Sequence, residues 1–167
     1  MKVRIDKFGQ WNAFLHLQKN LTKELHIARK ECLRRWGLKA EAIAKGHLRD
    51  QDLANGFWKP LAAYTIRKKA GWGASLDTLV ETGNYLESIT SWADINAAYV
   101  GVRVGQKAKR GGLTMGEVAR IQEFGSYAAG IPARPLWQPT YNETVNWHIQ
   151  HNNVADIFLK NIRQRYN

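Results

Sequence analysis

Residues 121–140 read IQEFGSYAAGIPARPLWQPT, and they join the end of a helix to a segment that three prolines stiffen. Gly125 is a residue type that often ends helices, because glycine adopts the left-handed backbone conformation without strain. Pro132, Pro135 and Pro139 each fix φ, lack an N–H donor and push the preceding residue toward an extended conformation. The stretch therefore predicts an extended arm, which is excluded from a central strand and suits the edge of a sheet.

A capping box lies on each side of this arm. Thr114 and Glu117 form a T-x-x-E pattern, which predicts a helix that begins after Thr114 and ends at Gly125. Thr140 and Glu143 repeat the pattern and predict a C-terminal helix that runs toward Arg165, with Asn152 and Asn153 weakening its apolar side.

The N-terminal third has the pattern of one long amphipathic helix. Apolar residues recur at steps of three or four, at Phe14, Leu17, Leu21, Leu25, Ala28, Cys32 and Trp36. Gly37 could interrupt this helix, but Ala40, Ile43 and Ala44 continue the stripe.

The middle of the chain predicts short elements. Residues 61–69 suit a short helix that Gly71 and Gly73 end, and residues 82–84 suit a turn. Residues 89–92 and 97–104 suit strands, because apolar and other residues alternate in the second of them. The expected fold is a single α+β domain over residues 1–167, with a long N-terminal amphipathic helix, a small antiparallel sheet, a short middle helix and a C-terminal helix.

The composition indicates a basic globular protein. The 167 residues carry a net charge of +11 and contain one cysteine, Cys32, which excludes an internal disulfide. Between Lys19 and Arg49 the sequence contains nine Lys and Arg residues but only three glutamates. This surface is either solvated or directed at an acidic partner or DNA. No apolar run approaches the roughly 18 residues of a membrane span, so we expect no membrane association.

No pattern of residues indicates catalysis, a cofactor or a metal. The phosphate-binding loop, the dinucleotide fingerprint and the zinc and hydrolase motifs are all missing from the sequence. His148 and His151 are three residues apart, but only Asp156 could extend them to a ligand set. Glu123 could act as a general base, and an ion pair with Arg134 is the preferred interpretation. We therefore expect no enzymatic activity.

Several segments, taken in order, resemble one protein family. They are residues 58–61 with Thr65 and Lys68; Leu79, residues 82–83, Leu86 and residues 88–89; residues 100–102 and 119–121; and residues 123–125 and 131–136. Together they resemble the small tail-completion or virion-morphogenesis proteins of tailed bacteriophages over about half the chain. Gln122 stands where relatives often have histidine, and Leu136 with Trp137 stands where they often have phenylalanine.

The resemblance implies a structural virion protein of the head–tail junction, in the tail or neck of a particle assembled in the host cytoplasm. It implies a closed ring of copies of this chain, expected to be sixfold, with a channel through which DNA passes without sequence-specific binding. Other neck and tail proteins would be its partners. The alternative is a basic nucleic-acid-binding module.

Two surfaces are candidates for these contacts. The arm suits a heterologous contact between copies, since its stiffness lowers the entropy lost on docking; the other reading is that it packs on its own domain. The residues of this expected subunit interface are Glu123, Phe124, Ile131, Pro132, Arg134, Pro135, Leu136 and Trp137. The loop 105–112 either projects into the channel or toward an adjoining ring, or lies in solvent, and its cations are Lys107, Lys109 and Arg110.

Overall fold

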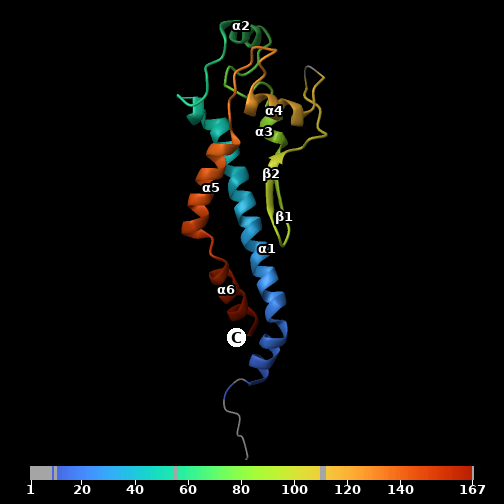
Figure 1. Ribbon diagram of the computed structural model, residues 1–167, viewed down its shortest axis with the longest axis vertical. Coiled ribbons are helices and arrows are strands. Elements are labelled where there is room, and N and C mark those ends of the chain that lie inside the picture. Colours follow the sequence, from blue (N-terminus) through green and yellow to red (C-terminus); the bar gives the residue numbers. More distant parts are fainter. Residues whose placement is uncertain (1–8, 10, 55, 110–111, 167) are drawn as a thin grey trace, which may run out of the picture.

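The computed structural model describes residues 9, 11–54, 56–109 and 112–166. The molecule is elongated, and one helix, α1 (Trp11–Asp50), runs along most of its length (Figure 1). Its 40 residues correspond to about 60 Å at 1.5 Å per residue. The expected α+β fold class is confirmed, because the remaining elements are helices and one two-stranded antiparallel sheet.

The long helix is continuous through Gly37, which the sequence left as a possible interruption. A Cβ atom built at this position would lie 3.4 Å from the Cβ of Ser91 and 3.8 Å from that of Ala98. Gly37 therefore marks the place where the sheet lies close against the helix. The buried side chains of α1 are Glu24, Ala28, Cys32, Ala40, Ile43, Ala44, His47 and Leu48.

The sheet is a hairpin of β1 (Ile89–Ala93) and β2 (Ala98–Val102), with Ile89 opposite Val102 and Trp92 opposite Tyr99. Both strands contact α1, and the hydroxyl of Ser91 donates to Oε2 of Glu41 at 2.7 Å. The rings of Trp92 and Tyr99 stack on the exposed face with centroids 5.3 Å apart. The hairpin thus buries one face on α1 and presents two aromatic rings on the other.

Short helices gather at one end of the molecule, which we call the globular end (residues 52–88 and 103–136; Figure 1). They are the 3-10 helix Asp52–Ala54, α2 (Ala63–Gly71), α3 (Asn84–Ser88) and α4 (Met115–Phe124). The short helix near residues 61–69 and the capping box of Thr114 are confirmed, and α4 ends before Gly125 as predicted. Helix α3 was not foreseen.

The C-terminal region differs from its prediction in two ways. It forms two helices, α5 (Trp137–His151) and α6 (Val154–Tyr166), which run back along α1 (Figure 1). The break is held by Asn152, whose Nδ2 donates to the carbonyl of Cys32 at 2.8 Å. The expected capping box at Thr140 is wrong, because α5 already begins at Trp137 and the Thr140 hydroxyl donates to the carbonyl of Leu136.

The main hydrophobic core lies at the junction of α1 and the globular end. Its buried members are Ala44, Leu48, Trp58, Tyr85, Ile89, Met115, Ala119 and Leu136. A second, smaller cluster of Ala28, Cys32 and Ile157 joins α1 to α6. Because Cys32 is buried there, desolvation raises the pKa of its thiol, which makes it a packing residue rather than a nucleophile.

Candidate functional site: a cationic cavity beside the arm

The arm that follows α4 is folded on its own subunit. Ser126 and Ile131 exchange two backbone hydrogen bonds of 2.8 and 2.9 Å, which form a tight turn. The N–H of Arg134 then donates to the carbonyl of Gln122 at 2.6 Å. Gly125 permits this return: its φ is +77°, and a Cβ atom there would lie 2.8 Å from the carbonyl oxygen of Ile131. The arm therefore lies against the end of α4 rather than forming an edge strand.

The ion pair expected between Glu123 and Arg134 does not form, and this prediction is wrong. Arg134 is 6% exposed, and its Nε and Nη2 donate to the carbonyls of Lys59 and Pro60 at 2.9 and 3.3 Å. Oε2 of Glu123 instead accepts the N–H groups of Leu136 and Trp137. Both charged groups therefore bind backbone atoms, and these contacts join the arm to its own subunit.

The apolar residues of the arm also face inward. Leu136 is fully buried in the main core, and Trp137 packs against the same cluster. The carbonyl of Pro135 accepts the indole N–H of Trp58 at 2.8 Å. Trp137 therefore packs partly on the core of its own subunit, and its role as an anchor for a neighbouring subunit stays a prediction.

The exposed aromatic residues near the arm are Phe124 and Tyr127. Phe124 is 77% exposed at the end of α4, and the side chain of Tyr127 stands fully in solvent on the turn. Phe124 belonged to the predicted interface, whereas Tyr127 did not. Its position in a run of small residues gave no sign of whether it would point inward or outward.

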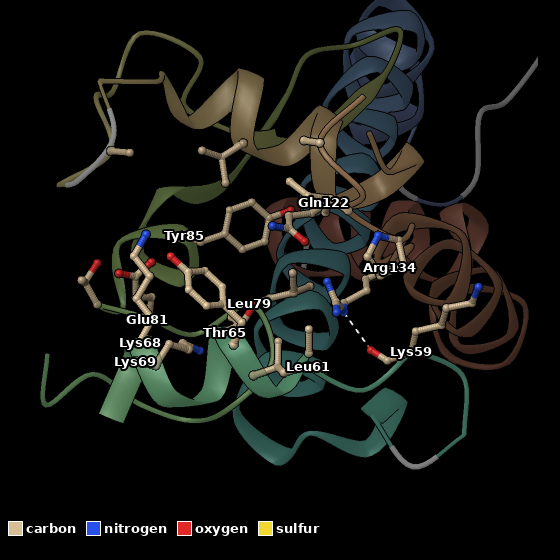
Figure 2. Close-up of a pocket in the computed structure, with 18 of the residues that line it drawn as sticks. Lys59, Leu61, Thr65, Lys68, Lys69, Leu79, Glu81, Tyr85, Gln122 and Arg134 are labelled. Carbon is tan, nitrogen blue, oxygen red and sulfur yellow. Dashed lines mark hydrogen bonds between the residues drawn. The ribbon is translucent and has the colours of Figure 1, made fainter. Parts of the chain in front are cut away.

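Beside the arm, the globular end contains a partly open cavity of about 940 Å³ (Figure 2). Its walls come from the segment before α2, from α2 itself, from residues 79–85, from α4 and from the arm. The predicted interface residues Ile131, Pro132 and Arg134 all line it. The other side chains that line it include Leu61, Tyr64, Thr65, Lys68, Lys69, Trp72, Leu79, Glu81, Tyr85, Lys109, Met115, Val118 and Gln122.

The charge that lines this cavity is predominantly positive. Among the described residues, five cationic side chains line it, against the carboxylate of Glu81. Lys69 is 7% exposed, and its ammonium group donates to the carbonyls of Asp77 and Val80 at 2.6 and 3.2 Å. Burial lowers the pKa of Lys69, the nearby charge of Arg134 lowers it further, and Glu81 and Asp77 oppose both effects. Burial likewise lowers the pKa of Arg134.

Aromatic rings form the rim and the floor of the cavity. The Lys68 ammonium lies 4.7 Å from the ring centroid of Trp72 and 5.9 Å from that of Tyr64, within range of cation–π attraction. On the floor, burial raises the pKa of the Tyr85 phenol, so it stays protonated. Oε1 of Gln122 is buried in the wall without a hydrogen-bond partner among the described residues. The cavity thus combines apolar walls with a few polar groups, the usual composition of a binding site.

Of the three cations proposed for the loop 105–112, one reaches this cavity. Lys109 lines it, while Lys107 is exposed, and its backbone forms an isolated antiparallel β-bridge with Thr114. Arg110 lies outside the described residues. Two backbone hydrogen bonds join the described parts of this loop to the residues that follow it: the N–H of Ala108 donates to the carbonyl of Leu113, and the N–H of Met115 donates to that of Gln106.

The residues considered for a metal site are occupied in other ways. Nδ1 of His148 lies 3.1 Å from Asn152, and His151 stacks on Trp147. Within the described part of the chain, no three His, Cys, Asp or Glu side chains gather as a metal site would require. Over the same residues, no helix combines the length and the apolar character needed to cross a bilayer.

Lys69, Tyr85 and Trp72 were not foreseen as site residues. The run TIRKKAGWG contains adjacent lysines but does not show which of them is buried. Burial of Lys69 depends on residues 77–80, which contribute the two carbonyls that its ammonium group contacts. No protein-family model, curated protein or solved structure matches this chain.

Proposed function

We propose that this chain is a structural virion protein of the head–tail junction of a tailed bacteriophage. In this role it completes the tail or neck as a ring of identical copies, around a channel for DNA. The ordered set of motifs between residues 57 and 139 supports the assignment. It acts through its shape and its contacts with neighbouring chains rather than through a reaction.

The observation that carries this proposal is the distribution of exposed apolar side chains along an elongated molecule. Large exposed apolar clusters mark surfaces that other molecules cover. At the N-terminal end of α1 they are Trp11, Phe14, Leu15, Leu21 and Leu25; on the hairpin, Trp92, Ile95 and Tyr99; at the globular end, Phe57, Tyr64, Trp72, Phe124 and Tyr127. A subunit with neighbours on several sides accounts for all three groups.

The arrangement also changes which residues are proposed for contact between copies. Because most of the arm's anchors contact their own subunit, the contact is assigned to Phe124, at the end of α4, and to Tyr127, on the turn that follows, both of which are exposed. In a ring, this exposed pair meets a different surface on the next copy, as heterologous contacts require.

Mass photometry and electron microscopy of the purified chain, alone and with neck proteins, test this proposal. We expect rings of one defined size. Phe124→Ser combined with Tyr127→Ser should reduce ring formation while leaving the free energy of unfolding within about 0.5 kcal/mol of wild type. Ile149→Ser is the matched control, because Ile149 is 76% exposed on α5, away from the arm. A chain that stays monomeric and never enters particles would contradict the proposal.

The alternative function, a basic nucleic-acid-binding module, draws support from α1. Lys19, Lys23, Arg29 and Lys30 are exposed there. In contrast, Arg34 and Arg35 pair with Glu31. Binding to phosphates would weaken steeply as salt rises, because counterions are released on association. A salt titration with duplex DNA distinguishes tight binding by this face from weak, transient contact with DNA inside a ring.

A further inference from the structure

The cavity holds two buried cations whose direct partners carry no charge. Arg134 and Lys69 are both more than nine-tenths buried, and their hydrogen bonds go to the main-chain carbonyls of Lys59, Pro60, Asp77 and Val80. Within the described residues, Arg134 forms no ion pair with a carboxylate. The nearby carboxylates of Glu81 and Asp77 partly balance the charge of Lys69, whereas burial acts on Arg134 without such a balance. A buried charge without an opposite charge beside it is unfavourable, so an anion that reaches Arg134 gains strong electrostatic stabilisation.

The rest of the lining is suited to apolar groups. Leu61, Leu79 and the ring of Tyr85 line the cavity (Figure 2). Met115, Val118 and Ile131 line it as well. Its volume of about 940 Å³ is at the upper end of the range for ligand pockets, roughly 300–1,000 Å³. An inorganic anion would leave most of this space and its apolar surface uncovered. The occupant therefore carries both a negative charge and apolar bulk.

We propose that this cavity binds a segment of a neighbouring protein chain that presents a carboxylate beside a large apolar side chain. The carboxylate lies at Arg134 and Lys69, and the apolar side chain lies against Leu79 and Met115. That the neighbour is another virion protein rests on the proposed function; the recognition of carboxylate and apolar bulk rests on the cavity itself.

The exposed lysines at the edge of the cavity assist this recognition. Lys59, Lys68 and Lys109 line it and are exposed to solvent. Their positive potential attracts an acidic segment before contact and speeds its association. A nucleic-acid strand would share the charge preference, but its phosphates are flanked by sugars and bases, and the cavity that holds the two buried cations has several aliphatic side chains in its lining. The charge and the apolar lining together favour a peptide.

The test uses N-acetyl-L-phenylalanine and its neutral amide, N-acetyl-L-phenylalaninamide, as probes for the full chain. They differ only in the carboxylate, so the ratio of their dissociation constants isolates the contribution of the charge. Titrations followed by NMR or calorimetry should show the acid binding about tenfold more tightly than the amide, as expected for a hydrogen-bonded charge. Acetate alone should bind more weakly than either probe that contains the ring.

A matched pair of variants locates the binding. Thr65 lines the cavity from the first turn of α2, where an acidic side chain is compatible with the helix. Thr65→Glu supplies an internal carboxylate and should abolish the preference for the acid, whereas Thr65→Gln has nearly the same size and should retain it. Arg134→Lys, checked for folding by circular dichroism, should reduce the preference several-fold.

The outcomes separate this inference from the proposed function. Equal binding of acid and amide, or an unchanged preference in Thr65→Glu, would overturn the cavity assignment even if wild-type rings form. Tighter binding of inorganic phosphate or of a short oligothymidylate than of N-acetyl-L-phenylalanine would overturn it as well. A normal preference in a chain that never forms rings would keep the carboxylate site and reject a virion neighbour as its source.

Discussion

Oε2 of Glu123 accepts the backbone N–H groups of Leu136 and Trp137, at 2.8 and 3.3 Å, so the carboxylate near the end of α4 caps the start of α5. The first N–H groups of a helix have no partner within it, and a negative charge is favourable there. One side chain thereby joins two helices that 12 residues separate in the sequence. It also closes the loop from which the arm is made.

Removing this charge should destabilise the fold. We expect Glu123→Gln to lower the free energy of unfolding by about 1 kcal/mol, and Glu123→Ala by about 2 kcal/mol, because the amide retains one acceptor. Urea denaturation measures both values. Asp50→Asn is the control, since Asp50 is exposed at the end of α1 and should change stability by less than about 0.5 kcal/mol. Equal effects of Glu123→Gln and Asp50→Asn would show that the cap is unimportant.

Two glycines of the arm should respond differently to alanine. Gly125 has a positive φ, and an added Cβ atom would lie 2.9 Å from the backbone nitrogen of Ala133. Gly130 also has a positive φ, but nothing lies within 4 Å of its added Cβ. Gly125→Ala should therefore cost about 2–4 kcal/mol and Gly130→Ala about 1 kcal/mol, measured by thermal or chemical unfolding. Similar costs at both positions would mean that the backbone near Gly125 moves easily.

The indole of Trp58 holds the arm from the side of the core. It is 2% exposed and donates to the carbonyl of Pro135, so Trp58→Phe removes a hydrogen bond and leaves an unfilled volume. We expect a loss of about 2 kcal/mol and faster limited proteolysis in residues 126–136. Trp92→Phe is the control: Trp92 is 62% exposed, and its replacement should change stability by less than about 0.5 kcal/mol. Unchanged cleavage in Trp58→Phe would show that the arm is held by other contacts.

Gly37 should tolerate alanine but not a larger residue. An alanine Cβ would meet Ser91 at an ordinary contact distance of 3.4 Å, and alanine favours the helix, so Gly37→Ala should stabilise the protein by up to about 1 kcal/mol. Gly37→Leu should destabilise it by about 1–3 kcal/mol, because the side chain would push the hairpin from α1. Calorimetry of both variants tests this, and a stabilising leucine would show that the hairpin is loosely attached.

The free energy of unfolding should depend on pH through the carboxyl of Glu31. Hydrogen bonds from Arg34, and then from Arg35, lower the pKa of its carboxyl from 4.5 to about 2, although partial burial opposes them. A lowered pKa stabilises the folded state above the unfolded-state value, and this contribution is lost as the pH falls from about 4.5 toward 2. Because the site is largely solvated, Glu31→Gln should cost less than about 1 kcal/mol at neutral pH. The difference in the free energy of unfolding between Glu31→Gln and wild type should vanish as the pH falls through this range. A difference that stays constant with pH would contradict the assignment.

Much of the fold followed from local patterns. The long helix, the strands near residues 89–102 and the helix between Thr114 and Gly125 were predicted, because each depends on periodicity or on a capping motif within one segment. The Thr140 motif failed because the N-cap position of α5 is Leu136, four residues earlier, where Glu123 accepts the backbone N–H. The break between α5 and α6 at Asn152 was not predicted, because the side chain of Asn152 binds the carbonyl of Cys32, which lies 120 residues away in the sequence.

The candidate site was predicted less well. Sequence reasoning identified Arg134, Ile131 and Pro132, which line the cavity, because they stand in an unusual proline-rich run. It assigned Arg134 the wrong partner, since the arm's orientation depends on contacts with residues 58–60. Lys69 was missed altogether, because an exposed and a buried lysine look alike in a sequence.

The sequence by itself determined where the long helix, the two strands and α2 form, where α4 begins and ends, and that three prolines stiffen the arm. These features arise from backbone preferences and hydrogen bonds between residues close along the chain. The tertiary structure alone decided which face of the arm is buried, that Arg134 and Lys69 share one cavity, and that Phe124 and Tyr127 remain outside. Those outcomes depend on which distant segments compete for the same apolar surface and the same carbonyl groups, and no local pattern records that competition.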